Sequence, residues 1–165
     1  MFRSFRRVGV LGVTAVAAGA FSAVAAVPAS AAEGFEFTLY AQEVPTDQGG
    51  DTTGPPAELG DSFAFADDLF RSKGGDKVGR DGVTCTVVRT GSPNDLVCVG
   101  TFVLNGGPGG QIMGQTLLSV DPDAEEQAAF DIAVTGGTGD FKDARGTIRS
   151  TPDGDFSRLE FHITR

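Results

Sequence analysis

The chain has 165 residues, of which 22 are acidic and 13 are basic, and its formal net charge is −9. This excess of negative charge argues against nucleic acid and anionic lipid as partners, because both would be repelled by it. The single histidine, His162, and the two cysteines do not have the spacing of a zinc site. We therefore expect no nucleic-acid partner and no metal.

The first 31 residues have the pattern of a secretory signal peptide. Three arginines among the first seven residues precede an apolar run over 8–27, and Ala29-Ser30-Ala31 supplies the small side chains of a cleavage site. We expect cleavage after Ala31, secretion, and a mature domain over 32–165 without a membrane partner. The alternative is an uncleaved anchor, since the run approaches the length of a bilayer span. Cleavage leaves ten basic residues against 22 acidic ones, a net charge of −12.

The mature chain predicts strands and no convincing helix. Short segments rich in Val, Ile, Thr and Phe are separated by clusters of Gly, Pro, Asn and Asp. Eight short strands at regular spacing indicate an all-β sandwich or closed barrel in a single domain. The predicted strands are 35–42, 60–70, 82–90, 95–104, 111–120, 128–135, 143–150 and 156–164.

Two irregular stretches separate these segments. Residues 44–58 form the longest, and a loop of that size in a small domain is typical of a functional or disordered segment, which we place at a barrel mouth. Residues 105–110 form a glycine-rich turn. It does not predict a phosphate site, because no helix follows it.

Alternation along the strands predicts which side chains share a face. Phe63 and Phe65 have the same parity as Asp67, so all three are expected on one face. The segment 95–104 has apolar or small side chains on both faces, whereas a strand with one face in solvent should alternate apolar and polar side chains. We therefore expect a homo-oligomer that buries part of the outer wall, or a second layer that covers it.

The chain has two cysteines, Cys85 and Cys98. Because the number is even and the chain is expected to be exported, a disulfide is favoured over two buried thiols. If the two cysteines face each other across antiparallel strands, Val87 lies opposite Leu96. The chain then reverses near Gly91-Ser92-Pro93.

Several stretches resemble the barrel superfamily of the allene oxide cyclases and dirigent proteins. They are LGDSFAFADDLF at 59–70, KVGRDG at 77–82, GTF at 100–102 and GQIMGQ at 110–115. The stretch at 77–82 resembles the turn that follows the first of these in the family, so we expect a turn there. The most specific is VTGGTGDFKDARG at 134–146, which resembles the dirigent GGTG-x-F-x-x-ARG signature. The resemblance implies an eight-stranded antiparallel β-barrel with an apolar cavity, trimeric in the plant members, and chemistry without cofactors.

The resemblance also implies site residues. Asp67-Asp68 matches a paired acid of the dirigent proteins, and because adjacent strand residues point to opposite faces, we favour Asp67 as the general acid in the cavity. Arg145 matches the arginine of the ARG motif, where it would hold a substrate oxyanion or pair with Asp67 or Asp61. The alternatives are a solvated acidic pair at a strand end and a structural ion pair at Arg145.

Other side chains are candidates for binding or for the fold. The candidate binding residues are Tyr40, Asp61, Phe63, Phe65 and Phe102. Gly136, Gly137 and Gly139 are expected in a tight turn that needs positive φ.

Two functions of different class remain open. The first is a secreted, cofactor-free cyclase or isomerase that orients an apolar, oxygenated small molecule. The second is a secreted, non-catalytic binding protein for a hydrophobic metabolite. A third option is an interaction module whose interior is filled by its own phenylalanines.

Overall fold

The computed structural model describes residues 34–45, 58–121, 123–124 and 127–165, so the predicted leader and most of the 44–58 loop lie outside it. Almost all of the described chain is β-strand. The elements are β1 (Gly34–Glu43), β2 (Ser62–Phe65), β3 (Asp67–Phe70), β4 (Lys77–Arg89), β5 (Asn94–Leu104), β6 (Gly110–Val120), β7 (Phe130–Gly137), the 3₁₀ turn η1 (Gly139–Phe141), β8 (Arg145–Asp153) and β9 (Phe156–Thr164).

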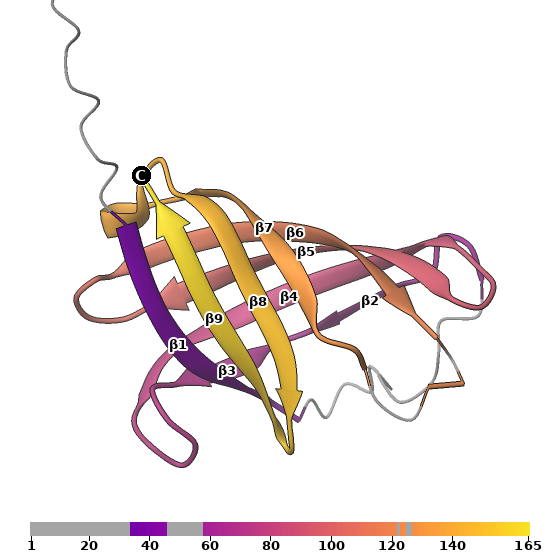
Figure 1. The fold of residues 1–165 in the computed structure, drawn as a ribbon, viewed down its shortest axis with the longest axis horizontal. Helices are drawn as coiled ribbons and strands as arrows, with labels where there is room; N and C mark the ends of the chain where they lie inside the picture. The colour runs from indigo at the N-terminus through magenta and orange to yellow at the C-terminus, as the bar shows by residue number, and fades with distance from the viewer. Residues whose placement is uncertain (1–33, 46–57, 122, 125–126) are drawn as a thin grey trace, which may run out of the picture. The chain divides into compact units, whose positions relative to one another are not determined.

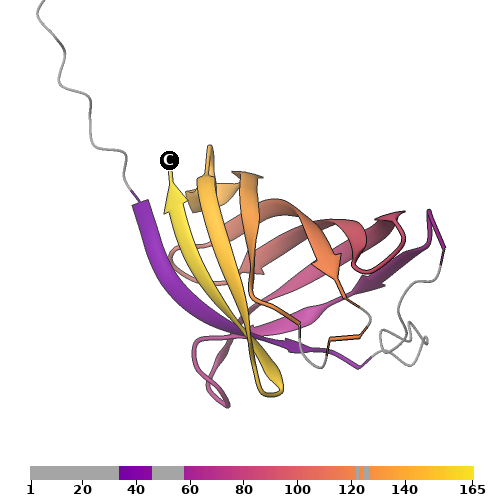
Figure 2. The ribbon, with the colours of Figure 1, turned by 45° about the vertical axis from the view of Figure 1, so that its right-hand side comes forward.

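The strands form one antiparallel sheet that closes on itself. Their order is β2-β4-β3-β1-β9-β8-β7-β6-β5, and the pairing of β4 with β5 closes the barrel. β2 and β3 are consecutive pieces of one wall, interrupted at Ala66, and both pair with β4. The described residues thus form the predicted eight-stranded barrel, which curves around its interior in Figures 1 and 2.

One predicted boundary is wrong. The stretch 77–82 was expected to be a turn, but it is the first part of β4, which pairs with β3 on one side and β5 on the other. The stretch has the composition of a turn, but one of its glycines, Gly79, has another role. A Cβ on Gly79 would overlap the backbone oxygen of Val103, so glycine there permits close strand packing.

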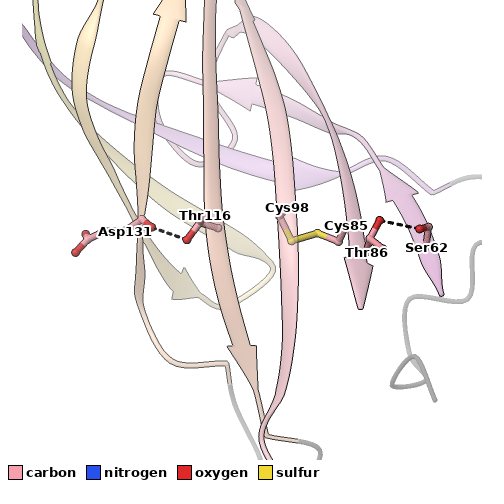
Figure 3. The surroundings of a disulfide bond; sticks show 6 residues. All are labelled: Ser62, Cys85, Thr86, Cys98, Thr116 and Asp131. Carbon is pink, nitrogen blue, oxygen red and sulfur yellow. Dashed lines mark hydrogen bonds between the residues drawn. A yellow bond between two sulfur atoms is a disulfide. The ribbon is translucent and has the colours of Figure 1, made fainter. Parts of the chain in front are cut away.

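The predicted cysteine register is confirmed. Cys85 lies opposite Cys98, Val87 lies opposite Leu96, and the two sulfurs form a disulfide. Figure 3 shows this bridge crossing from β4 to β5, at the level where Thr116 donates a hydrogen bond to the Asp131 carbonyl. Both cysteines point inward, with side chains only 2% and 6% exposed.

The barrel interior has two unlike halves. In one half, aromatic side chains pack together: Phe37 stacks on Phe161 at 4.5 Å between centroids, and Phe102 contacts Phe161 edge-on at 5.5 Å. The other half has a smaller cluster around the disulfide. The β6–β7 ladder ends at Gln115 and Ala133, so these two strands continue without pairing at that end.

The signature at 134–146 closes the packed half. Phe141 in η1 is fully buried and contacts Phe35 at 5.2 Å, and Asp140 accepts a hydrogen bond from the Gly109 N–H of the β5–β6 turn. Gly139 has φ +63, as expected of a turn. Gly136 and Gly137 were also expected in that turn, but both lie in β7.

Gly146 carries the strongest backbone constraint in the signature. Its φ is +133, and a Cβ there would overlap the backbone oxygen of His162 on β9. We expect Gly146→Ala to lower the free energy of unfolding by more than about 3 kcal/mol, because strain and a backbone clash add together. Gly154→Ala is the matched control, since Gly154 has φ +67 and open space around it, and should cost about 1 kcal/mol. Urea unfolding of both variants tests this, and equal losses would contradict it.

The outer wall of β5 and β6 is apolar and exposed. Val97 and Leu117 are cross-strand partners with 41% and 60% of their surface accessible, and Val99 is 50% exposed. Within the described part of the chain, no layer of this barrel covers these side chains.

The same described residues include no helix long and apolar enough to cross a membrane.

Candidate functional site

The unfilled half of the barrel holds a cavity of about 840 Å³. This volume is within the range that drug-sized ligands occupy in proteins. Inward-facing residues of every strand line it, and the disulfide forms part of its wall. The apolar lining includes Phe63, Phe65, Val83, Leu96, Phe102, Leu118, Val120, Phe130, Ile132 and Leu159.

Two carboxyl groups meet in this cavity. The pairing of β2 with β4 sets Phe65 opposite Val83, and the same register carried two residues further sets Asp67 opposite Asp81. The Asp67 N–H donates a hydrogen bond to Asp81 Oδ1 at 3.0 Å, and the two side chains are also hydrogen-bonded to each other. Asp81 is only 6% exposed, and both residues line the cavity.

Burial keeps a proton in this pair. Removal from water raises the pKa of Asp81 to about 8, and the negative charge of Asp67 adds to the rise. Burial also raises the pKa of Asp67, with contributions from Glu43 and Asp68, while its hydrogen bond with Asp81 lowers it. At neutral pH Asp81 therefore keeps its proton, and the hydrogen bond with Asp81 favours the charged form of Asp67 against the effect of burial.

Asp81 is the site residue that the sequence analysis missed. Its segment was assigned to a turn, so no direction was predicted for its side chain. If β4 is extended back to Lys77, Asp81 has the same parity as Val83 and Cys85 and must point inward. The signal that could have found it is the alternation Asp81, Val83, Cys85, Val87, which the turn-like glycines obscured.

The predicted site residues divide into two groups. Asp67 lies in the cavity, as do the binding candidates Asp61, Phe63, Phe65 and Phe102. Asp68 points outward, where its Oδ1 forms an ion pair with Lys77 Nζ at 2.5 Å. Tyr40 has outward parity on β1, opposite Phe70 and Arg158, and does not line the cavity.

The placement expected for Arg145 is wrong. Arg145 begins β8 at the packed end of the barrel, is exposed, and donates a hydrogen bond from Nη1 to the Ala144 carbonyl at 2.6 Å. The first residue of β8 that lines the cavity is Ser150, five residues later and about 16 Å along the strand. Arg145 therefore cannot pair with Asp67 or hold a ligand in the cavity.

One edge of the cavity has a run of polar groups. From Asp81 and Asp67 this edge continues through Ala41 on β1 to Ser157, its partner on β9, and then to Ser150 on β8. β5 and β6 contribute apolar side chains, part of the disulfide, and the polar residues Asn94, Gln115 and Thr116. The cavity can thus bind an apolar body and hydrogen-bond its oxygen atoms, along this edge among other places. Among the described residues, no three His, Cys, Asp or Glu side chains gather as metal ligands.

The fold defines the class of protein to which this site can be compared. No family model and no curated protein matches the chain. Solved structures do match: pyocyanin demethylase is 27% identical with a TM-score of 0.59, and the match covers 79% of this chain and 100% of that one. Two pterocarpan synthase dirigent proteins are 19% and 18% identical, both with TM-scores of 0.56, over 79% of this chain and 88% and 93% of theirs.

These likenesses confirm the predicted fold. The chain is an allene oxide cyclase/dirigent-like barrel. Barrels of this fold are involved in the binding or conversion of small molecules. The buried Cys85–Cys98 disulfide is consistent with an extracellular protein.

Proposed function

We propose that this chain is a secreted, cofactor-free barrel that binds an apolar, oxygenated small molecule and steers its cyclisation or isomerisation. The observation that carries the proposal is the Asp67–Asp81 pair, which holds a proton at the wall of an otherwise apolar cavity. Acids that keep a proton at neutral pH are suited to general acid catalysis. The names of the similar structures, a demethylase of pyocyanin and two pterocarpan synthases, support a small molecule as substrate.

The proposed mechanism needs only proton transfer and orientation. The apolar wall holds the ligand in one conformation, which removes much of the entropic cost of ring closure. The pair donates its proton to a ligand oxygen as a bond to that oxygen breaks or polarises. When the new bond forms, a proton returns from the product to the pair, so atoms and electrons balance without an oxidant or reductant.

The alternative is a non-catalytic binding protein for a hydrophobic metabolite. One observation favours it: Arg145, the second group expected in catalysis, lies at the packed end of the barrel. The acid pair would then only hydrogen-bond the ligand, and the bound compound would be released unchanged.

We also propose that the chain forms a homo-oligomer, a trimer as the resemblance implies. The support is the exposed apolar wall formed by Val97, Val99 and Leu117, which a second copy would remove from water. This interface would leave the cavity separate in each subunit, because these side chains point away from it.

Binding and turnover are tested with the mature protein purified from culture supernatant. Nile red, an uncharged apolar dye, should bind to the wild type with increased emission. Leu118→Trp should reduce that binding at least tenfold, because Leu118 lines the cavity, and the outward-facing Thr147→Trp should not. Equal binding by the two variants would place the dye outside the cavity and contradict the proposal.

Catalysis is tested with the compound that native mass spectrometry finds bound to the same protein. Wild type should convert it to an isomer, and Asp81→Asn should slow that conversion by about 10²-fold or more, as expected for loss of a general acid. A compound that wild type binds and returns unchanged would favour the binding protein.

A further inference from the structure

The charge of the cavity lining is of one sign. Four aspartates line it, at positions 61, 67, 81 and 121, and no lysine, arginine or histidine is among the described residues that do. The neighbouring cations are on the outer wall: Lys77 pairs with Asp68, and Arg80 is exposed opposite Asp68. Residues 46–57 contain no basic residue either. Among the residues that the structure describes, the cavity lining thus has no cationic side chain that could neutralise a bound anion.

The two acids in contact at the cavity wall supply no positive charge. Burial raises the pKa of both Asp67 and Asp81, to about 8 for Asp81, and a carboxyl group that keeps its proton is neutral. Glu43 and Asp68 lie close enough to Asp67 to act on it as further negative charges. An anionic ligand beside this pair would lose its hydration and meet only like charges, and such burial without a partner is expensive.

The polar edge of the cavity offers a different kind of recognition. The protonated carboxyl donates a hydrogen bond, the carboxylate accepts one, and the hydroxyls of Ser150 and Ser157 do either. Ser150 is only 5% exposed, so its hydroxyl faces the interior of the barrel. These groups satisfy carbonyl, ether or hydroxyl oxygens without a counter-charge.

Resting on the proposed binding function, we infer that the ligand is an apolar molecule with carbonyl, ether or hydroxyl oxygens and no negative charge. Carboxylates, sulfonates and phosphates of the same size are excluded. The net charge of −12 expected for the mature chain also disfavours anionic ligands, because it repels them before they reach the cavity.

Three probes of nearly equal shape test this: 2-naphthamide, which is neutral, 2-naphthamidine, which is a cation, and 2-naphthoate, which is an anion. Isothermal titration calorimetry of the wild type at pH 7 should give the amide and the amidine at least tenfold higher affinity than the carboxylate. Asp67→Asn/Asp81→Asn should reduce the preference for amide over carboxylate to below threefold. Asp131→Asn changes the same charge on the outer wall, where Asp131 pairs with Arg149, and should leave the preference unchanged.

The outcomes separate this inference from the proposed function. If the carboxylate binds within threefold of the amide, the exclusion of anions is wrong while the cavity still binds small molecules. If neither the amide nor the amidine binds to the folded wild type, the proposed binding function itself fails. Circular dichroism checks the fold of each variant, and the single variant Asp81→Asn replaces the double one if the latter does not fold.

Discussion

Asp81→Asn is expected to make the barrel more stable than the wild type at pH 9 and nearly equal to it at pH 4. The pKa of Asp81 is about 8 in the folded state, against 3.8 for an ordinary aspartate. Below pH 4 the group is protonated in both states and contributes no pH dependence. Between pH 4 and 8 the unfolded chain releases the proton while the folded chain keeps it, so stability falls as the pH rises.

The size of this effect is large for a single side chain. Each unit of pKa difference corresponds to about 1.4 kcal/mol, so the gain of Asp81→Asn over wild type should grow by at least about 2 kcal/mol from pH 4 to pH 9. Asparagine can keep both hydrogen bonds to Asp67, since its amide donates and its oxygen accepts. The variant therefore removes the titration with little change in packing.

Urea unfolding of wild type and Asp81→Asn at several pH values measures this gain. Asp131→Asn is the control, because Asp131 is exposed and its replacement should give a small difference that varies little with pH. Parallel pH profiles for wild type and Asp81→Asn would mean that Asp81 is already ionised at neutral pH, and the acid role would be lost with it.

Loss of the Cys85–Cys98 bridge is expected to lower the free energy of unfolding by about 3 kcal/mol. The bridge closes a short loop, since the two cysteines are 13 positions apart in the sequence, and it constrains the unfolded chain. Cys85→Ala/Cys98→Ala should lose somewhat more than this, because the variant also removes two buried sulfurs beside Phe63 and Leu96.

Reduction of the wild type separates these two contributions. Reduced wild type keeps both sulfur atoms and loses only the cross-link, so its urea midpoint should lie between those of the oxidised wild type and the double alanine variant. If the oxidised and reduced wild type unfold at the same midpoint, the bridge does not stabilise the barrel. Its presence would then matter only as part of the cavity wall.

Sequence reasoning succeeded where the pattern is local. The strands and the placement of Asp67 on the same face as Phe63 and Phe65 follow from alternation with period two, and the opposition of Cys85 and Cys98 follows from pairing the two cysteines of an exported chain. Sequence reasoning failed at 77–82, because a glycine that permits close strand packing, such as Gly79, cannot be told by composition from a glycine that forms a turn. Asp81 was therefore missed as a site residue, although the inward direction of its side chain could have been predicted from Val83 and Cys85, which have the same parity.

The amino-acid sequence by itself predicted an all-β chain, a disulfide between its two cysteines and, through its resemblance to a known family, a barrel in which Asp67 rather than Asp68 is favoured to point inward. Only the tertiary structure decided that Asp81 lies opposite Asp67, that Arg145 lies at the packed end, and that one half of the interior is hollow. The physical reason is that a side chain's face depends on its own strand. Its height in the barrel depends on the stagger between strands distant in sequence, and no local pattern encodes that stagger.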